Sequence, residues 1–257
     1  MSLLSEERKM KIMELVVNEG KVKVTKLAKD FNVSTETIRR DLEELESGKK
    51  LKKVYGGAVK LKPVVDELSM FEREILSIEE KKRIGRKAAS FIQEGEIIFI
   101  DEGSTTLQMI PALKSIANVT IITNSFPLAI KLMEYDQTQK FAGQLIFLGG
   151  HVNSKHFRSS GSLTERIAKE FYVDKAFIAI DGLHHVSGMT SYDLHKCLLS
   201  KVFIDNAIET FALVDHSKIG VTANYQIERL KYIDYIISDV PLPEQLINLH
   251  TKWIHSP

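Results

Sequence analysis

Residues 33–45 read VSTETIRRDLEEL, and this stretch decides how the first quarter of the chain folds. At 100° per residue its apolar side chains fall on one face of a helix: Ile38, Leu42 and Leu45. Ser34 precedes the run and is a suitable N-cap, because its hydroxyl can accept a hydrogen bond from a free N–H of the first turn. The pattern predicts an amphipathic helix that packs through Ile38 and turns Arg39 and Arg40 outward.

The segments on either side of this helix complete a helix-turn-helix with a wing. Upstream, KVKVTKLAKDF (residues 21–31) predicts a shorter helix with Thr25 as its N-cap, joined to the next helix by a tight turn. Downstream, residues 49–62 contain six lysines and no acid, and Tyr55-Gly56-Gly57 is typical of a hairpin turn. In such motifs the second helix enters the major groove of DNA by its N-terminal end.

The residues expected to contact DNA are those at the start of that helix and on the basic hairpin. Arginine can form paired hydrogen bonds to guanine or phosphate, threonine and serine can reach bases or phosphates, and the lysines of a wing neutralise phosphates. The set is Ser34, Thr35, Thr37, Arg39, Arg40, Lys50, Lys52, Lys53 and Tyr55. Four glutamates between residues 36 and 46 repel phosphate, so we expect contact to be confined to the helix start.

Charge is unevenly distributed along the chain, which has 257 residues and a net charge of +1. Residues 1–62 carry 15 Lys and Arg against 10 Asp and Glu, whereas the remainder carries 20 against 24. This basic part indicates a polyanionic partner for the N-terminal region alone. The single cysteine, Cys197, excludes an intramolecular disulfide, and no segment reaches the ~20 apolar residues of a membrane span. We expect a cytoplasmic protein without membrane association, metal or cofactor.

Composition changes after the lysine-rich hairpin. Pro63 opens a stretch in which acids replace lysines, and this predicts a linker over residues 60–76. The expected division is a winged helix-turn-helix domain over residues 3–59, with the helix-turn-helix itself at about 20–39, and a larger domain over residues 77–257.

The larger domain alternates short apolar runs with helical segments. Six runs of this kind end abruptly in small or polar residues: IIFIDEGSTT, VTIITNS, LIFLGG, KAFIAIDG, TFALVDHSK and YIISD. Continuous apolar strands separated by helices predict an α/β fold with a mostly parallel sheet covered on both faces. Ligands of such sheets bind at the carboxyl ends of the strands.

The polar residues at those strand ends are therefore the candidate ligand site. The loop from Asp101 to Thr106 offers a glycine, hydroxyls and a helix start, which together suit a phosphate. It is neither a P-loop nor a dinucleotide-binding fingerprint, because the required Gly and Lys residues are absent. If the strand ends converge, they form a polar pocket with one fixed cation. The candidate set is Asp101, Gly103, Ser104, Thr105, Thr106, Asn124, Ser125, Gly149, Gly150, Asp181 and Lys218.

These motifs together resemble the DeoR-type family of bacterial transcriptional regulators. In the first domain the resemblance rests on TIRRDL and on YGGA, where Tyr55 replaces the more usual His. In the larger domain it rests on EKKRIG, DEGSTT, TNS, the glycine pair after LIFL, DKAF and DHSK. One departure is His195-Lys196, near a place where the family commonly carries an acidic residue.

The resemblance implies a larger domain like ribose-5-phosphate isomerase and a repressor of carbohydrate-catabolism genes. Its partners would be double-stranded operator DNA and a phosphorylated sugar or related metabolite that modulates operator binding. A helix-turn-helix protein that reads two half-sites acts as a homo-oligomer, either a dimer or a tetramer.

An enzyme is the alternative: a sugar-phosphate isomerase with an accessory DNA-binding domain. Proton transfer between sugar carbons needs a positioned carboxylate base, and Asp101, Asp181 and Asp193 are the candidates. The missing acid near residues 195–196 argues against this reading. We therefore expect a regulator rather than an enzyme.

Overall fold

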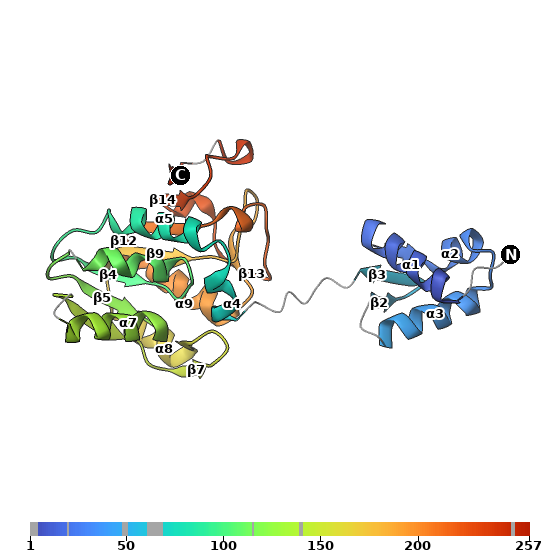
Figure 1. Ribbon diagram of the computed structural model, residues 1–257, viewed down its shortest axis with the longest axis horizontal. Helices are drawn as coiled ribbons and strands as arrows, with labels where there is room; N and C mark the ends of the chain where they lie inside the picture. Colours follow the sequence, from blue (N-terminus) through green and yellow to red (C-terminus); the bar gives the residue numbers. More distant parts are fainter. Residues whose placement is uncertain are drawn as a thin grey trace. The chain divides into compact units, whose positions relative to one another are not determined.

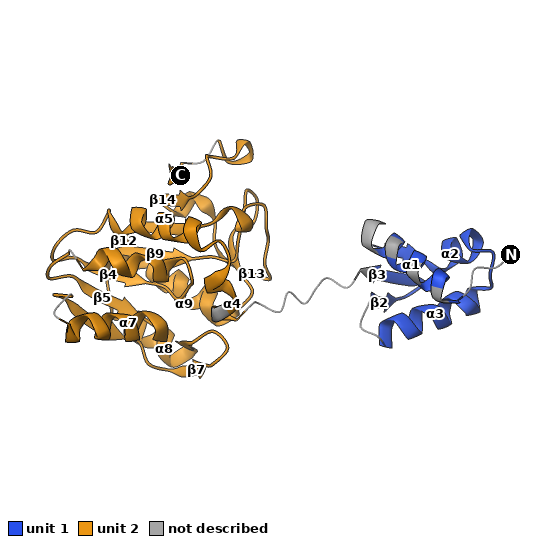
Figure 2. Ribbon diagram, viewed as in Figure 1, with its two compact units in different colours: residues 1–66 blue, residues 67–257 orange. Residues whose placement is uncertain are grey.

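The chain folds into two compact units, residues 1–66 and 67–257, coloured separately in Figure 2. The computed structural model describes residues 5–19, 21–47, 51–60, 69–114, 116–138, 141–247 and 250–257. Among these residues, no helix has the length and apolar character that crossing a bilayer requires.

The first unit is a winged helix-turn-helix, as predicted. Its described residues form these elements in chain order, most of them labelled in Figure 1: α1 (Ser5–Glu19), β1 (Lys21–Lys23), α2 (Val24–Asp30), α3 (Thr35–Ser47), β2 (Leu51–Val54) and β3 (Gly57–Lys60). The strands form an antiparallel sheet in the order β1-β3-β2. Because α3 has 13 residues, the helix-turn-helix continues well past the predicted end near residue 39.

Strand β1 was not predicted, and it also changes where α2 begins. The strand pairs with β3, and the Val24 N–H donates to the Gly56 carbonyl, 2.9 Å away. Extended backbone therefore runs directly into the helix, whose N-cap is Lys23 rather than the expected Thr25. Three residues are too few for a strand pattern to stand out in the sequence.

The core of the first unit contains the apolar face that the sequence predicted for α3. Ile38, Leu42 and Leu45 are buried together with residues of the other helices and strands: Ile12, Val16, Val22, Leu27, Leu51 and Ala58. A buried ion pair joins α1 to α3, with the Arg8 Nε donating to Asp41 Oδ2 at 2.5 Å and its second nitrogen to Oδ1 at 3.0 Å. This pair fixes the angle at which α3 is presented.

The second unit is built on a seven-stranded sheet in the order β15-β14-β12-β9-β4-β5-β6, in which every neighbouring pair is parallel. The predicted α/β class is thus confirmed. The strands are β4 (Ile97–Ile100), β5 (Thr120–Thr123), β6 (Gln144–Phe147), β9 (Val173–Ala179), β12 (Ala207–Val214), β14 (Tyr235–Ser238) and β15 (Lys252–His255). The first six correspond to the six apolar runs of the sequence.

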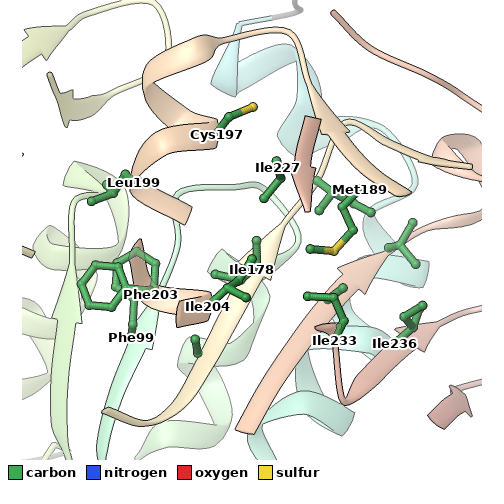
Figure 3. Close-up of a cluster of buried hydrophobic side chains, with 14 of the residues drawn as sticks. Phe99, Ile178, Met189, Cys197, Leu199, Phe203, Ile204, Ile227, Ile233 and Ile236 are labelled. Atoms are coloured by element: carbon green, nitrogen blue, oxygen red, sulfur yellow. The ribbon is translucent and has the colours of Figure 1, made fainter. Parts of the chain in front are cut away.

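Helices cover both faces of this sheet (Figure 1). One apolar cluster unites the sheet with α5 (Ile78–Ala89), α6 (Ile110–Leu113) and α7 (Phe126–Gln137). The other includes α8 (Ser162–Ala168) and α9 (Leu194–Asp205). Figure 3 shows part of this second cluster, in which Phe203 of α9 stacks on Phe99 of β4 with ring centroids 3.6 Å apart.

The order of strands creates a switch point between β4 and β9. From β4 the chain proceeds to β5 and β6 on one side, and it then returns to place β9, β12, β14 and β15 on the other. Connections leave neighbouring strands in opposite directions there, which opens a crevice at the carboxyl ends of β4 and β9.

Smaller elements surround that end of the sheet. They are the β7–β8 hairpin (His151–Asn153 and Arg158–Ser160) and an antiparallel sheet of β10 (Gly182–His184), β11 (Gly188–Ser191) and β13 (Tyr225–Glu228). A further helix, α4 (Met70–Ile75), lies within residues 60–76, which the sequence assigned to a linker. A Ser69–Glu72 capping box starts it, and residues 69–76 belong to the second unit. Residues 61–68 lie outside the described part of the chain.

Candidate functional site

The start of α3 is organised by Ser34. Its Oγ accepts a hydrogen bond from the Thr37 N–H at 3.0 Å and lies 2.8 Å from the Thr37 hydroxyl. This N-cap is the one that the sequence predicted, and it sets the first turn of the helix. Thr35 is exposed at that turn, whereas Thr37 is half-buried.

Arg39 and Arg40 project from the helix into solvent, with side chains that are 60% and 82% exposed. Each reaches a glutamate on the same helix: Arg39 lies 3.2 Å from Glu36 and Arg40 3.7 Å from Glu44. Exposed pairs of this kind contribute little to stability, so either arginine can exchange its glutamate for a phosphate or a base edge at small cost.

The hairpin is attached to α3. The Lys53 backbone N–H donates to Glu46 at 2.8 Å, and its ammonium lies 2.6 Å from Glu43. Tyr55 is fully exposed at the tip. Gly57 has no room for a side chain, because a Cβ there would lie 2.0 Å from the Val22 carbonyl oxygen of β1. Of the other predicted wing residues, Lys50 and the side chain of Lys52 lie outside what the structure describes.

A pocket opens at the switch point of the second unit. It lies at the carboxyl ends of β4, β9 and β12, and α4, α5 and α9 complete its walls. Its charged lining consists of four cations and two carboxylates: Arg73, Lys81, Lys196, Lys218, Asp181 and Asp215. Hydroxyls come from Ser77, Ser104, Thr105 and Ser217. Gly103 allows the β4 loop to approach β9, because a Cβ there would lie 2.4 Å from that of Ala179.

Behind this lining lies a cluster of buried charges centred on Glu102. Arg158 is fully buried, donates to Glu102 Oε1 and lies 2.8 Å from Asp193. Arg73 of α4 lies 3.5 Å from Glu102 and 3.6 Å from Asp181. The cluster thus connects β4, the β7–β8 hairpin, α4 and the start of α9 through charges that are buried apart from the partly exposed Asp193.

Burial and mutual attraction set the protonation of this cluster. Burial raises the pKa of Asp101 to about 7, and its Oδ2 accepts a hydrogen bond from Ser200 at 3.1 Å. Burial acts to raise the pKa of Glu102 as well, but Arg158, Lys196 and Arg73 outweigh it and lower that pKa to about 2. Glu102 is therefore a permanent anion that holds three cations around it.

Lys81 of α5 is a cation that burial makes easier to deprotonate. Burial lowers the pKa of Lys81 to about 8, opposed in part by the nearby carboxylate of Asp215. Its ammonium donates to the Arg73 backbone carbonyl at 2.5 Å. Lys81 thus lines the pocket and at the same time holds the end of α4.

The structure brings five of the predicted ligand residues to the pocket lining: Gly103, Ser104, Thr105, Asp181 and Lys218. Two others support its loop from behind. Asp101 is buried against Ser200, and the Thr106 hydroxyl donates to the Asp101 carbonyl at 2.7 Å.

The remaining four predicted residues lie outside the pocket lining, because they follow β5 and β6, on the far side of β4 from the switch point. Asn124 donates to the Ser159 carbonyl at 2.9 Å, and Ser125 caps α7. The Gly149 carbonyl accepts from Thr164 at 2.9 Å, and a Cβ on Gly150 would lie 2.0 Å from the same hydroxyl. These residues fix the loops that carry Arg158 toward the cluster.

Five charged residues at the site were not among the predicted ligand residues: Arg73, Lys81, Glu102, Arg158 and Lys196. Glu102 and Lys81 lie within the motifs DEGSTT and EKKRIG, so the sequence could have indicated them as site residues. Arg158 follows a glycine-pair loop without any local signal, and Arg73 lies in the expected linker. Asp193, considered as an enzyme base, instead caps α9 and pairs with Arg158.

Comparison with known proteins assigns the two units to two known domains. Residues 8–64 match the DeoR-like helix-turn-helix domain, and residues 76–240 match the DeoR C terminal sensor domain. The transcriptional regulator YulB of Bacillus subtilis is 34% identical over 92% of this chain and 90% of its own length. The glycerol-3-phosphate regulon repressor of Escherichia coli is 30% identical over 93% of both chains. The transcriptional repressor GlcR of Bacillus subtilis is 32% identical over 95% of this chain and 91% of its own.

Among solved structures, ribose 5-phosphate isomerase A from Neisseria gonorrhoeae covers 55% of this chain and 53% of its own, with 21% identity and a TM-score of 0.39. That similarity is too distant to bear on function. The curated relatives, in contrast, are named as transcriptional regulators and repressors rather than enzymes. On the strength of both matched domains and of these relatives, the chain belongs to the DeoR family of helix-turn-helix transcriptional regulators.

Proposed function

We propose that the protein is a repressor of carbohydrate-catabolism genes whose operator binding is modulated by a phosphorylated sugar or related metabolite. The observation that carries the proposal is the pocket at the switch point, where four cationic side chains face two carboxylates in the same chain as a winged helix-turn-helix. Because the operator is chromosomal DNA, the proposed place of action is the cytoplasm.

On the DNA side, the proposed contacts divide into two kinds. Thr35, Arg39 and Arg40 are exposed at the start of α3, where a recognition helix meets base edges. Lys53 and Tyr55, with Lys50 and Lys52, would contact phosphates from the hairpin, and Ser34 and Thr37 would set the helix start. Phosphate contacts release counterions, so operator affinity should fall steeply as salt rises.

On the ligand side, charge favours an anion such as phosphate. The pocket lining has two more cations than carboxylates. Arg73 and Lys196 are matched by Glu102 and Asp181 of the buried cluster, so a surplus of one cation remains where Lys81 and Lys218 lie beside Asp215. The hydroxyls of Ser104 and Thr105 add donors for phosphate oxygens. The name of the glycerol-3-phosphate regulon repressor, a relative over nearly its full length, is in keeping with a phosphorylated metabolite.

The pocket also offers a route from ligand to DNA. Two of its cations hold α4: Arg73 by its own side chain, and Lys81 by donating to the Arg73 carbonyl. Helix α4 is the first described element after the connection from the DNA-binding unit. An anion that competes for Arg73 and Lys81 would change the free energy with which α4 docks, and hence the arrangement of the attached helix-turn-helix.

Such an effect requires more than one DNA-binding unit. A helix-turn-helix homo-oligomer, whether dimer or tetramer, binds half-sites about 34 Å apart or at a multiple of that distance. A ligand then weakens operator binding only by its differential affinity for the two arrangements.

The test uses the full-length protein and a duplex selected from a randomised pool. Thermal-shift screening against phosphorylated and unphosphorylated sugars should give stabilisation by phosphorylated ones only, and the same compounds should change duplex affinity. A screen in which unphosphorylated sugars stabilise equally well would refute the ligand assignment. A stabilising compound that leaves duplex affinity unchanged would refute the regulatory link.

A further inference from the structure

Lys196 occupies an unusual place in the pocket wall. It lies in the first turn of α9, its side chain is 1% exposed, and it lines the pocket beside Asp181 and Gly103. Its ammonium lies 3.5 Å from Glu102 Oε1 and 3.7 Å from Asp181 Oδ2. The ammonium nitrogen makes no hydrogen bond with any residue that the structure describes, although the Lys196 backbone N–H donates to Asp193.

The nearby carboxylates and the missing hydrogen bond have different consequences for Lys196. The nearby carboxylates compensate the charge: burial alone would lower the pKa of Lys196, but Asp181, Glu102 and Asp101 raise it, so the ammonium stays protonated. The distances, however, leave three N–H donors without an acceptor among the described residues. A buried donor without an acceptor is costly, and the pocket is the open side from which an acceptor can arrive.

Charge balance indicates what kind of acceptor fits. The ion pairs around Lys196 join three cations to three carboxylates: Arg73, Arg158, Lys196, Glu102, Asp181 and Asp193. Asp101 is a further carboxyl group that acts on Lys196, and its pKa of about 7 leaves it partly ionised. The cluster therefore has no surplus of positive charge, and a second anionic group of a ligand would be repelled by Asp181. A hydroxyl or carbonyl oxygen would take the free hydrogen bond without adding charge.

We propose that Lys196 is a specificity-determining residue, which donates a hydrogen bond to an uncharged oxygen, a hydroxyl or a carbonyl, on the sugar part of the ligand. The proposal rests on the proposed function, in which a phosphate lies near Lys81 and Lys218. It assigns the two ends of the ligand to different groups of residues: the phosphate to the cationic end of the pocket and the sugar oxygen to Lys196.

Because phosphate and sugar would bind to different residues, the proposal can be tested by comparing the affinity for sugar phosphates with the affinity for inorganic phosphate. Calorimetric titration of the full-length protein would use glucose 6-phosphate, fructose 6-phosphate, ribose 5-phosphate, glycerol 3-phosphate and inorganic phosphate. In the unaltered protein the preferred sugar phosphate should bind more tightly than inorganic phosphate. In Lys196→Met this preference should fall by roughly 10-fold or more, because a hydrogen bond to a charged donor is lost, while phosphate affinity changes by less than about threefold.

Two further variants separate recognition from folding. Lys196→Arg keeps the positive charge beside Glu102 and Asp181 but moves the donors, so it should fold and should change the order of preference among the four organic phosphates. Lys201→Met, one turn later on α9 with a half-exposed side chain, should leave both the preference and its order unchanged.

The outcomes distinguish a failure of the proposed ligand class from a failure of the proposed role of Lys196. If the unaltered protein binds none of the five compounds, the ligand half of the proposed function fails and this inference falls with it. If it prefers a sugar phosphate and both Lys196 variants keep that preference in the same order, only the role of Lys196 is refuted. An equal loss of affinity for the sugar phosphate and for inorganic phosphate in a folded Lys196→Met variant would also refute the role of Lys196 in selectivity. Lys196 would then act on the pocket as a whole.

Discussion

The two units place their charges in opposite ways. On α3, Arg39 and Arg40 are mostly exposed, and each is paired only with a glutamate on its own helix. In the second unit, Arg158 and Lys196 are buried and are held by carboxylates from other segments of the chain. The first arrangement costs little to rearrange, and the second is fixed when the chain folds.

The difference between exposed and buried charge suits the two partners of the proposed function, DNA and a small metabolite. DNA presents a regular row of phosphates, which exposed arginines and lysines can meet with small adjustments and with a strong dependence on salt. A small metabolite must be distinguished from close analogues, and buried donors do this because a ligand without the matching acceptor leaves them unsatisfied. In the proposed function, exposed charge would serve affinity for DNA, whereas buried charge would serve selectivity for the ligand.

The largest effect should come from breaking the buried cluster. Arg158→Met removes the cation that Glu102 and Asp193 share, and breaking a buried ion pair by removing one partner costs about 3–5 kcal/mol. Chemical denaturation of the second unit would measure it. Lys82→Met is the matched control on the surface: its partner Glu79 is exposed, and the loss should stay below about 1 kcal/mol. Similar losses in both variants would contradict the contrast between buried and exposed pairs.

The second effect concerns exposed charge on α3. The double variant Arg39→Ala, Arg40→Ala should bind a selected duplex on the order of 10- to 100-fold more weakly, because contacts to bases or phosphates are lost. Unfolding of the first unit should change by less than about 1 kcal/mol, since both pairs are exposed. Fluorescence anisotropy and denaturation would check the two parts. Unchanged duplex affinity would remove α3 from its role as recognition helix.

A smaller effect concerns the cap that positions those arginines. Ser34→Ala removes the acceptor for the Thr37 N–H and should cost the first unit about 1 kcal/mol of unfolding free energy. Ser34→Asp restores an acceptor at the same position and should regain most of that stability. Hydrogen exchange of the first turn of α3 would follow the change; equal protection in the alanine variant and the unaltered protein would speak against the cap.

The smallest effect is the dependence of ligand binding on pH. The pKa of Lys81 is about 8, lowered by burial, so the group loses its charge between pH 7 and pH 9. Affinity for a phosphorylated sugar should therefore fall several-fold over this range. Calorimetry between pH 8 and pH 9, above most of the titration of Asp101, would compare the unaltered protein with Lys81→Met. The variant should bind more weakly and with a flatter profile. A profile of the same slope in both proteins would assign the titration to another group.

The same contrast explains how much the sequence could predict. The α3 helix, its Ser34 cap and the hairpin turn at Tyr55 are set by neighbouring residues, so local patterns predicted them. The six apolar strands followed from continuous apolar runs for the same reason. Strand β15 was missed, because its sequence KWIH is short and mixed and its pairing with β14 is decided by tertiary contact.

Pocket residues were predicted only where they follow directly after a strand of the sheet. The loop at Gly103, the carboxylate of Asp181 and Lys218 end three central strands, and they do line it. Asn124 and Gly149 end strands too, but the order of strands places them beyond β4, and strand order cannot be derived from apolar runs. Arg73 and Arg158 come from a helix and a hairpin without local signals of function, so only the folded chain shows that they meet at Glu102.

We propose that the exposed basic unit binds DNA and that an anion in the pocket of the second unit governs this binding. The most direct test measures duplex affinity of the full-length protein as salt is raised, with and without a phosphorylated sugar that stabilises it. We expect log K to fall linearly and steeply with log salt, and we expect the sugar to shift the whole line in the unaltered protein but not in Arg73→Met. A flat salt dependence, or a line that the bound sugar leaves in place, would contradict it.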